Sequence, residues 1–75
     1  MNKKRREQIR TIVARLQGCV NEIELTKDEE DESRENMPEN LQYSDSYLHS
    51  EECSDILMDA VECISGTIND LEGIT

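Results

Sequence analysis

The residues with the clearest chemical potential are His49 and Cys53, which stand four positions apart and would share one face of a helix. Together they could provide two ligands of a zinc site, but such a site needs four. The other cysteines, Cys19 and Cys63, belong to no CxxC pair. As a nucleophile and its base, the pair would lack a group that favours the thiolate, and the surrounding acids disfavour it. We therefore expect buried cysteines, a surface histidine, no metal or other cofactor, and no enzymatic activity.

Carboxylates are concentrated in the middle of the chain. A run from Asp28 to Glu32 is followed by Glu35, but it lacks the alternating ligands and central glycine of a calcium-binding loop. The chain opens with a cluster of opposite charge, made of Lys3, Lys4, Arg5, Arg6 and Arg10. The net charge of -10 disfavours direct binding to nucleic acid and favours a basic partner protein. The charges therefore indicate an action by binding.

Length and composition indicate one small domain. A hydrophobic core in a chain of 75 residues supplies only about 3–5 kcal/mol without a disulfide, a metal or self-association. The 3 cysteines form an odd set, which argues against a disulfide framework and for a reducing cytoplasm. No apolar run is long enough for a signal peptide or a membrane helix. We expect a cytoplasmic protein, with no membrane contact, that gains stability by self-association.

Residues 3–32 carry apolar side chains at the 3-4-3-4 spacing of a coiled-coil stripe, and we expect them to form one helix. The stripe consists of Ile9, Ile12, Leu16, Cys19 and Ile23. Val13 and Val20 widen it on one side. Gly18 interrupts this helix, either as a tolerated surface glycine or as a point where another backbone approaches closely.

Residues 47–72 form the second expected helix, with Ser50 or a nearby serine or aspartate as its N-cap. Its contact stripe has 4-3-4-3 spacing and consists of Leu57, Val61, Ile64, Ile68 and Leu71. A further stripe beside it consists of Cys53, Ile56, Ala60 and Cys63. One antiparallel helix covers only a strip, so we assign this further stripe to self-association and favour a dimer. The expected fold is all-α: one antiparallel helical hairpin over residues 1–75 that associates into a helical bundle.

The connection, residues 33–46, is unusually apolar for an exposed loop. Pro38 disfavours a helical conformation at Met37 and so favours an end of the first helix before it. The apolar side chains in and beside the connection are Met37, Leu41, Tyr43 and Tyr47. Two interpretations remain open: these residues close the end of the bundle as a cap, or they form a recognition loop on a rigid scaffold.

The charges of the first helix oppose its macrodipole at both ends. In a hairpin, the basic start would lie near Asp70, Glu72 and the terminal carboxylate, which would offset that penalty. At the loop end only Lys27 and Arg34 oppose the acids. The acidic run then serves either solubility or docking on a basic partner. In the second case the partner-binding residues are Asp28, Glu29, Glu30, Asp31 and Glu32.

Residues 36–42 read Asn-Met-Pro-Glu-Asn-Leu-Gln, and an acidic amphipathic helix follows Ser44. In these features the chain resembles small acidic helical-hairpin accessory proteins of phages and prophages of Gram-positive bacteria. The resemblance covers most of the chain, although its specific part is the turn. It departs after Ser44, where those proteins tend to have an acidic-arginine-glycine step, so no role of that arginine carries over. The resemblance implies a helical hairpin in the cytoplasm of an infected bacterial host, without a mechanism.

Three functions follow as hypotheses. In the first, a non-enzymatic phage accessory protein binds and inhibits a host antiviral-defence or nucleic-acid-handling protein through its acidic surface. In the second, an oligomer sequesters a small nucleotide immune signal in pockets at subunit boundaries. The anion-binding residues would then be Lys3, Lys4, Arg5, Arg6 and Arg34. In the third, the apolar face of the second helix docks on a larger phage protein as an assembly helper.

Overall fold

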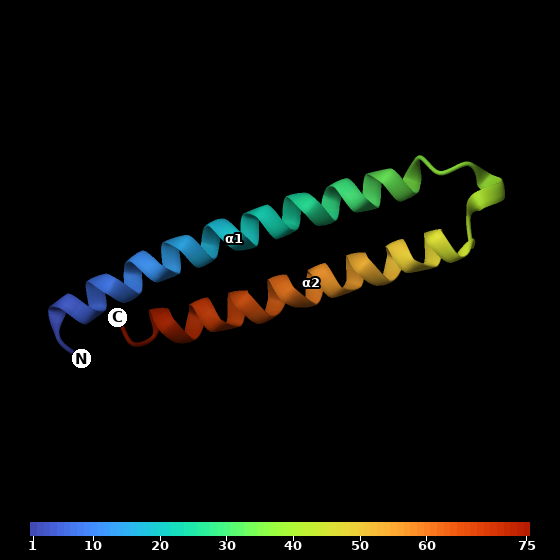
Figure 1. Ribbon diagram of the computed structural model, residues 1–75. Helices are drawn as coiled ribbons and strands as arrows, with labels where there is room; N and C mark the ends of the chain where they lie inside the picture. The colour runs from blue at the N-terminus through green and yellow to red at the C-terminus, as the bar shows by residue number, and fades with distance from the viewer.

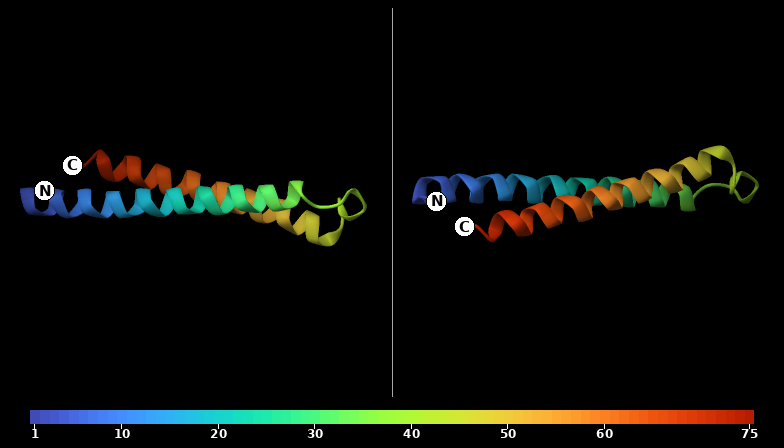
Figure 2. Two further views of the ribbon diagram at one scale, coloured as in Figure 1. Left: turned by 90° about the horizontal axis from the view of Figure 1, so that it is seen from above. Right: turned by 90° about the horizontal axis from the view of Figure 1, so that it is seen from below.

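The computed structural model describes all residues, 1–75. Its elements are α1 (Lys3–Glu35), a short 3-10 helix η1 (Glu39–Leu41) and α2 (Asp45–Glu72). The two long helices run antiparallel, with both chain ends at one end of the molecule and the connection at the other (Figure 1). Views from above and below show that the helices cross at a shallow angle (Figure 2). The expected all-α helical hairpin is thus confirmed, as a rod of 60 × 14 × 12 Å.

Side chains just outside each helix fix where the helices begin. The Asn2 side chain accepts a hydrogen bond from the backbone N–H of Arg5 at 2.9 Å and caps α1. The Ser44 hydroxyl accepts from the backbone N–H of Tyr47 at 3.3 Å and caps α2. These bonds satisfy backbone donors that have no partner inside the helix. The cap of α2 is therefore Ser44, and Ser50 lies inside the helix.

The end of α1 lies further along the chain than the sequence indicated. The helix continues to Glu35, and Asn36 caps it through backbone bonds to the carbonyls of Arg34 and Glu32. Pro38 follows, where its missing N–H and its ring prevent another helical turn. The helix thus extends beyond the expected end at residue 32, and the added turn carries Arg34 into the contact with α2.

The apolar contact between the helices lies in the half of the rod near the chain ends. Its buried centre consists of Val20, Val61 and Ile68, with exposed fractions of 2%, 8% and 4%. The half-buried side chains packed against this centre are Val13, Leu16, Ile23 and Ile64. The stripe of α2 that faces α1 is the one expected from the sequence, because Leu57 and Leu71 are also half-buried.

The contact stripe of α1 differs from the expected one. Val20 is the most buried side chain, whereas Ile12 is 40% exposed and Cys19 is exposed. Ile9, Leu16 and Ile23 border both the row of Ile12 and Cys19 and the row of Val13 and Val20. The apolar spacing alone therefore did not show which of these two rows faces α2. The actual row continues at sevenfold spacing from Val13 and Val20 to residues 27 and 34, whose side chains meet polar groups of α2.

Neither helix contains a stretch that is long and apolar enough to cross a membrane.

Most residues of α1 are polar or charged, and Val20 is its only buried residue. The interface between α1 and α2 is therefore narrow for a hairpin of this length.

Candidate functional site

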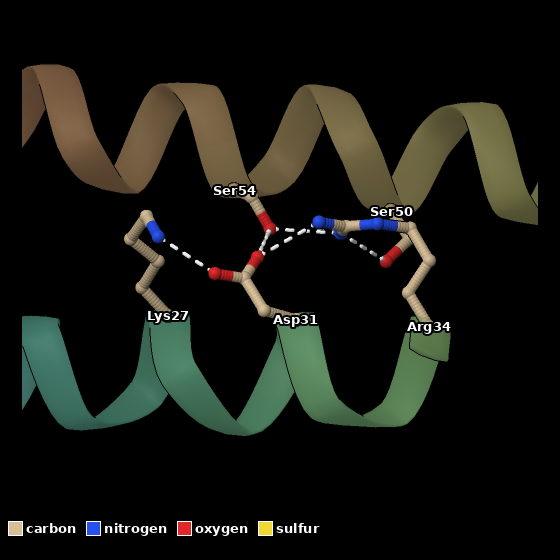
Figure 3. Close-up of polar contacts among 5 residues, drawn as sticks. All are labelled: Lys27, Asp31, Arg34, Ser50 and Ser54. Atoms are coloured by element: carbon tan, nitrogen blue, oxygen red, sulfur yellow. Dashed lines mark hydrogen bonds and ion pairs between the residues drawn. The ribbon is translucent and has the colours of Figure 1, made fainter. Parts of the chain in front are cut away.

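The half of the helix interface near the connection is polar. Three side chains of α1, Lys27, Asp31 and Arg34, point toward Ser50 and Ser54 of α2 (Figure 3). We call these five residues the polar network. Ser50 and Ser54 are buried, with exposed fractions of 7% and 5%, and they continue the contact stripe of α2 toward the connection. The polar network thus takes the place that apolar residues hold elsewhere along the rod.

Asp31 is the centre of the polar network. Its Oδ2 accepts a hydrogen bond from Lys27 Nζ at 2.6 Å, and its Oδ1 accepts from Arg34 Nη2 at 2.8 Å. The Ser54 hydroxyl donates to the same Oδ1 at 2.7 Å. The second guanidinium nitrogen of Arg34, Nη1, donates to the hydroxyls of Ser54 at 2.9 Å and Ser50 at 3.1 Å. No buried side-chain nitrogen or oxygen lacks a hydrogen-bond partner, so these polar groups are buried without the penalty of an unmade bond.

These contacts favour the charged form of every ionisable member of the polar network. Hydrogen bonds from Lys27, Ser54 and Arg34 hold the pKa of Asp31 well below its usual value. The hydrogen bond to Asp31 raises the pKa of Lys27, and it likewise raises the pKa of Arg34. The side chains of Lys27, Asp31 and Arg34 remain 20%, 28% and 17% exposed. The network is therefore an ion-paired cluster at the edge of the interface, where it ties the last turns of α1 to the start of α2.

Asp31 consequently differs from the other residues of the acidic run. The two ion pairs of the structure, with Lys27 and with Arg34, both use its carboxylate. Glu30 is half-buried beside α2, whereas Asp28, Glu29 and Glu32 are exposed. The sequence indicated partner binding for all five acids. Asp28, Glu29 and Glu32 remain accessible to a partner, whereas Asp31 is bound at the interface between the helices.

Exposed carboxylates gather around the connection from both helices. We call this set the acidic end surface, and it consists of Asp28, Glu29, Glu32, Glu35, Glu39, Asp45, Glu51, Glu52 and Asp55. None of them takes part in an ion pair, because both cations of this end of the rod are engaged by Asp31. The acidic end surface therefore keeps its negative charge uncompensated within the chain.

The apolar residues of the connection do not close the end of the rod as a unit. Met37 and Tyr47 are half-buried, but Leu41 is 46% exposed and Tyr43 is 79% exposed. The rings of Tyr43 and Tyr47 lie 5.9 Å apart between centroids and are tilted by 49°. Tyr43 also has a φ of 68°, a left-handed conformation that is uncommon and costly for a residue with a large side chain. The connection thus presents an aromatic and a leucine side chain to solvent beside the acidic end surface.

The basic residues proposed for anion binding do not form one pocket in a single chain. Lys3, Lys4, Arg5 and Arg6 are exposed at the start of α1, whereas Arg34 lies in the last turn of the same helix. Arg34 is also engaged by the polar network.

The expected compensation between the basic start and the end of α2 is small. Arg10 Nη2 donates to the main-chain oxygen of Thr75 at 3.4 Å, and Asp70 and Glu72 form no ion pair with the basic residues. The basic start of α1 therefore also keeps its charge uncompensated within the chain.

His49 and Cys53 do face each other on α2. Their Nε2 and Sγ atoms are 3.5 Å apart, as their spacing of one helical turn predicts. Cys53 is half-buried, and Cys19 and Cys63 are exposed, so the expectation of buried cysteines is wrong, because none of the three is buried. No group of three or more His, Cys, Asp and Glu side chains is placed to hold a metal ion.

The polar network was missed by sequence reasoning, although a signal for it exists. Lys27 and Arg34 lie seven and fourteen positions after Val20, and Ser50 and Ser54 lie seven positions before Leu57 and Val61. Residues seven apart lie on nearly the same side of a helix. Two cations in the contact row of one helix would lie opposite two serines in the contact row of the other. Because a cation placed in an interface needs an anionic partner, this pattern indicates that a nearby acid also lies there.

In comparisons of this chain with protein-family models, with curated proteins and with solved structures, none matches it.

Proposed function

We propose that this chain is a non-enzymatic binding protein whose acidic end surface docks on a basic surface of a host protein. The observation that supports the proposal is the gathering of exposed carboxylates from both helices at one end of the rod, with no cation of the chain paired to them. Such a surface attracts a basic partner over a long range and gives fast association that weakens with salt.

The geometry around the acidic end surface also supports docking. The polar network joins the last turns of α1 to the start of α2, and these parts of the chain also carry carboxylates of the acidic end surface. The two helices are therefore held together where the carboxylates lie. Leu41 and Tyr43 add exposed apolar surface next to them, and tyrosine is enriched among the residues that contribute most to binding at protein interfaces. Charge would then steer the encounter, and the connection would add short-range contacts.

The class of partner follows from the chemistry of the acidic end surface and from the resemblance to phage accessory proteins. A protein that handles nucleic acid presents cations to phosphates, and closely placed carboxylates can occupy the same cations. The proposed partner is therefore a host antiviral-defence or nucleic-acid-handling protein, and the proposed effect is inhibition by occupying its phosphate-binding surface.

Affinity capture from lysate of an infected host, with two charge-matched variants, tests this function. The test variant carries Asp28→Asn, Glu29→Gln, Glu32→Gln and Glu35→Gln, all at exposed positions of the acidic end surface. The control variant carries Glu7→Gln, Asp59→Asn, Glu62→Gln and Asp70→Asn, which are exposed elsewhere. Both variants leave Asp31 and the polar network intact.

The wild-type chain and the control variant are expected to recover the same basic partner, and the test variant is expected to lose it. Raising the salt concentration should release the partner from the wild-type chain, because exposed charges are screened. Equal recovery of that partner by the test and control variants would contradict the proposed mechanism.

A further inference from the structure

One long face of the hairpin is apolar and is left open by the contact between α1 and α2. Two shallow hollows lie along it, one bordered by Cys53 and Ile56 and the next by Cys19. Both hollows share Thr26 and Leu57, so they form one continuous groove between the helices. The groove shows that the stripe of α2 expected to mediate self-association lies on the same face as a stripe of α1.

Helical periodicity extends this face beyond the groove. On α1, Ile12 lies seven positions before Cys19, and on α2 the row of Cys53 and Ile56 continues to Ala60 and Cys63. We call this surface the cysteine face, and it consists of Ile12, Cys19, Thr26, Cys53, Ile56, Ala60 and Cys63. In the single chain Ile56 is 59% exposed and Ile12 is 40% exposed, Cys19 and Cys63 are exposed, and Cys53 and Ala60 are half-buried. None of these seven residues is charged, although Glu30 also lines the first hollow and Glu22 the second.

The charges of α1 that flank the cysteine face are arranged in a gradient, whereas α2 carries acids such as Glu52 and Asp59 and no Lys or Arg. One row of α1 beside it reads Arg15, Glu22 and Glu29 at sevenfold spacing, so it changes from positive to negative toward the connection. The same change occurs along α1 as a whole, from its basic start to the acidic end surface. A partner with the opposite gradient would complement this face, and the chain itself has that gradient when it is turned end for end.

We propose that two copies of this chain dock through the cysteine face in antiparallel orientation and form a four-helix bundle. The twofold arrangement places Arg15 of each copy beside the acids of the flanking row in the second copy. It also places the basic start of each α1 near the acidic end surface of the other copy. A parallel arrangement would instead bring the two acidic ends together, where like charges repel.

A second copy is the occupant that the rest of the structure favours. Only Val20, Val61 and Ile68 are buried apolar residues along a rod 60 Å in length, and small domains with such cores commonly gain stability by oligomerisation. A four-helix bundle covers two stripes on each helix where a hairpin covers one. The acidic end surface carries more charge than the basic start can balance, so it stays negative in the dimer.

Sedimentation analysis of the full chain over a range of concentrations tests the association. Ile56→Glu introduces a charge into the proposed interface, and Leu25→Glu is its matched control. Leu25 is 60% exposed, against 59% for Ile56, and it borders neither hollow. We expect a wild-type dimer, a dissociation constant raised about a hundredfold or more by Ile56→Glu, and a change below about threefold for Leu25→Glu. A wild-type chain that remains monomeric at high concentration, or equal effects of both variants, would overturn the proposal.

Thiol alkylation provides a measurement that needs no variant. Cys19 and Cys63 are exposed in the single chain, so their alkylation should slow as the protein concentration rises and the dimer forms. Rates that do not depend on concentration, together with a monomeric mass, would contradict association through this face.

Zero-length crosslinking of amines to carboxylates decides the orientation. Lys4 and Glu29 are separated by about 38 Å along α1, so a crosslink between them cannot form within one chain. An antiparallel dimer should give crosslinks from Lys3 or Lys4 to Glu29, Glu32 or Glu35, and these should disappear in Ile56→Glu. A dimer in which the lysines crosslink only to Asp70 or Glu72 would overturn the antiparallel arrangement.

Discussion

Replacing Ser54 by alanine is expected to destabilise the hairpin by about 1–2.5 kcal/mol, although the change removes one oxygen atom. Ser54 is 5% exposed, donates to Asp31 at 2.7 Å and accepts from Arg34 at 2.9 Å. A hydrogen bond to a charged group contributes about 1.5–3 kcal/mol to the free energy of unfolding. Alanine recovers about 0.5 kcal/mol because it is the better helix former, and the difference is the expected loss.

Urea unfolding at fixed protein concentration, followed by circular dichroism, measures this loss. The concentration must be equal for all variants, because association adds to the apparent stability. Ser65→Ala is the matched control, since Ser65 is half-buried in the same helix and lies outside the polar network. The control should stabilise the chain by about 0.5 kcal/mol through helix propensity alone. If Ser54→Ala stabilised the chain as much as the control does, the polar network would not contribute as its geometry indicates.

Two further predictions concern Asp31 and Gly18. The pKa of Asp31 is lowered in the folded chain by its bonds to Lys27, Ser54 and Arg34, so its contribution is present above the unfolded pKa of about 3.9 and is lost as the pH falls below it. Asp31→Asn should therefore destabilise the chain most at neutral pH, and urea unfolding should show the difference from wild type shrinking toward about pH 2.5; a difference independent of pH would contradict the ion-paired geometry. A Cβ at Gly18 would meet nothing within 4 Å, so Gly18→Ala should raise the free energy of unfolding by about 0.5–1 kcal/mol, seen as a higher midpoint of thermal unfolding. A lower midpoint would show that a backbone of another subunit packs against Gly18.

Sequence reasoning reached the hairpin because local signals agree with it. Apolar residues recur at helical spacing on both sides of the connection, and Pro38 prevents the first helix from continuing past the residues just before it. The contact stripe of α2 was also predictable, since Val61 and Ile68 lie at the centre of a single uninterrupted apolar row. For α1 two rows were available, and the apolar count favoured the row with Ile12 and Cys19, which lies beside the contact with α2 and remains exposed.

The candidate site was only partly predictable for the same kind of reason. The concentration of acids near the connection follows from the order of the two helices, so the sequence located it. The sequence treated Asp31 as one of five equivalent acids, and only its contacts with Lys27, Arg34 and Ser54 set it apart. Those contacts come from two helices, and the most distant pair of residues is separated by twenty-three positions in the chain.

By itself, the sequence determined two helices, their antiparallel order and the separation of basic and acidic ends, because periodicity, proline and charge act locally along the chain. Tertiary structure alone decided which row of α1 turns inward. A rotation of α1 about its own axis would keep every local preference satisfied, but it would bury Ser50 and Ser54 without the side chain of Arg34. A buried polar group without a partner is costly, so contacts between the helices choose the rotation, and with it the surface that remains open.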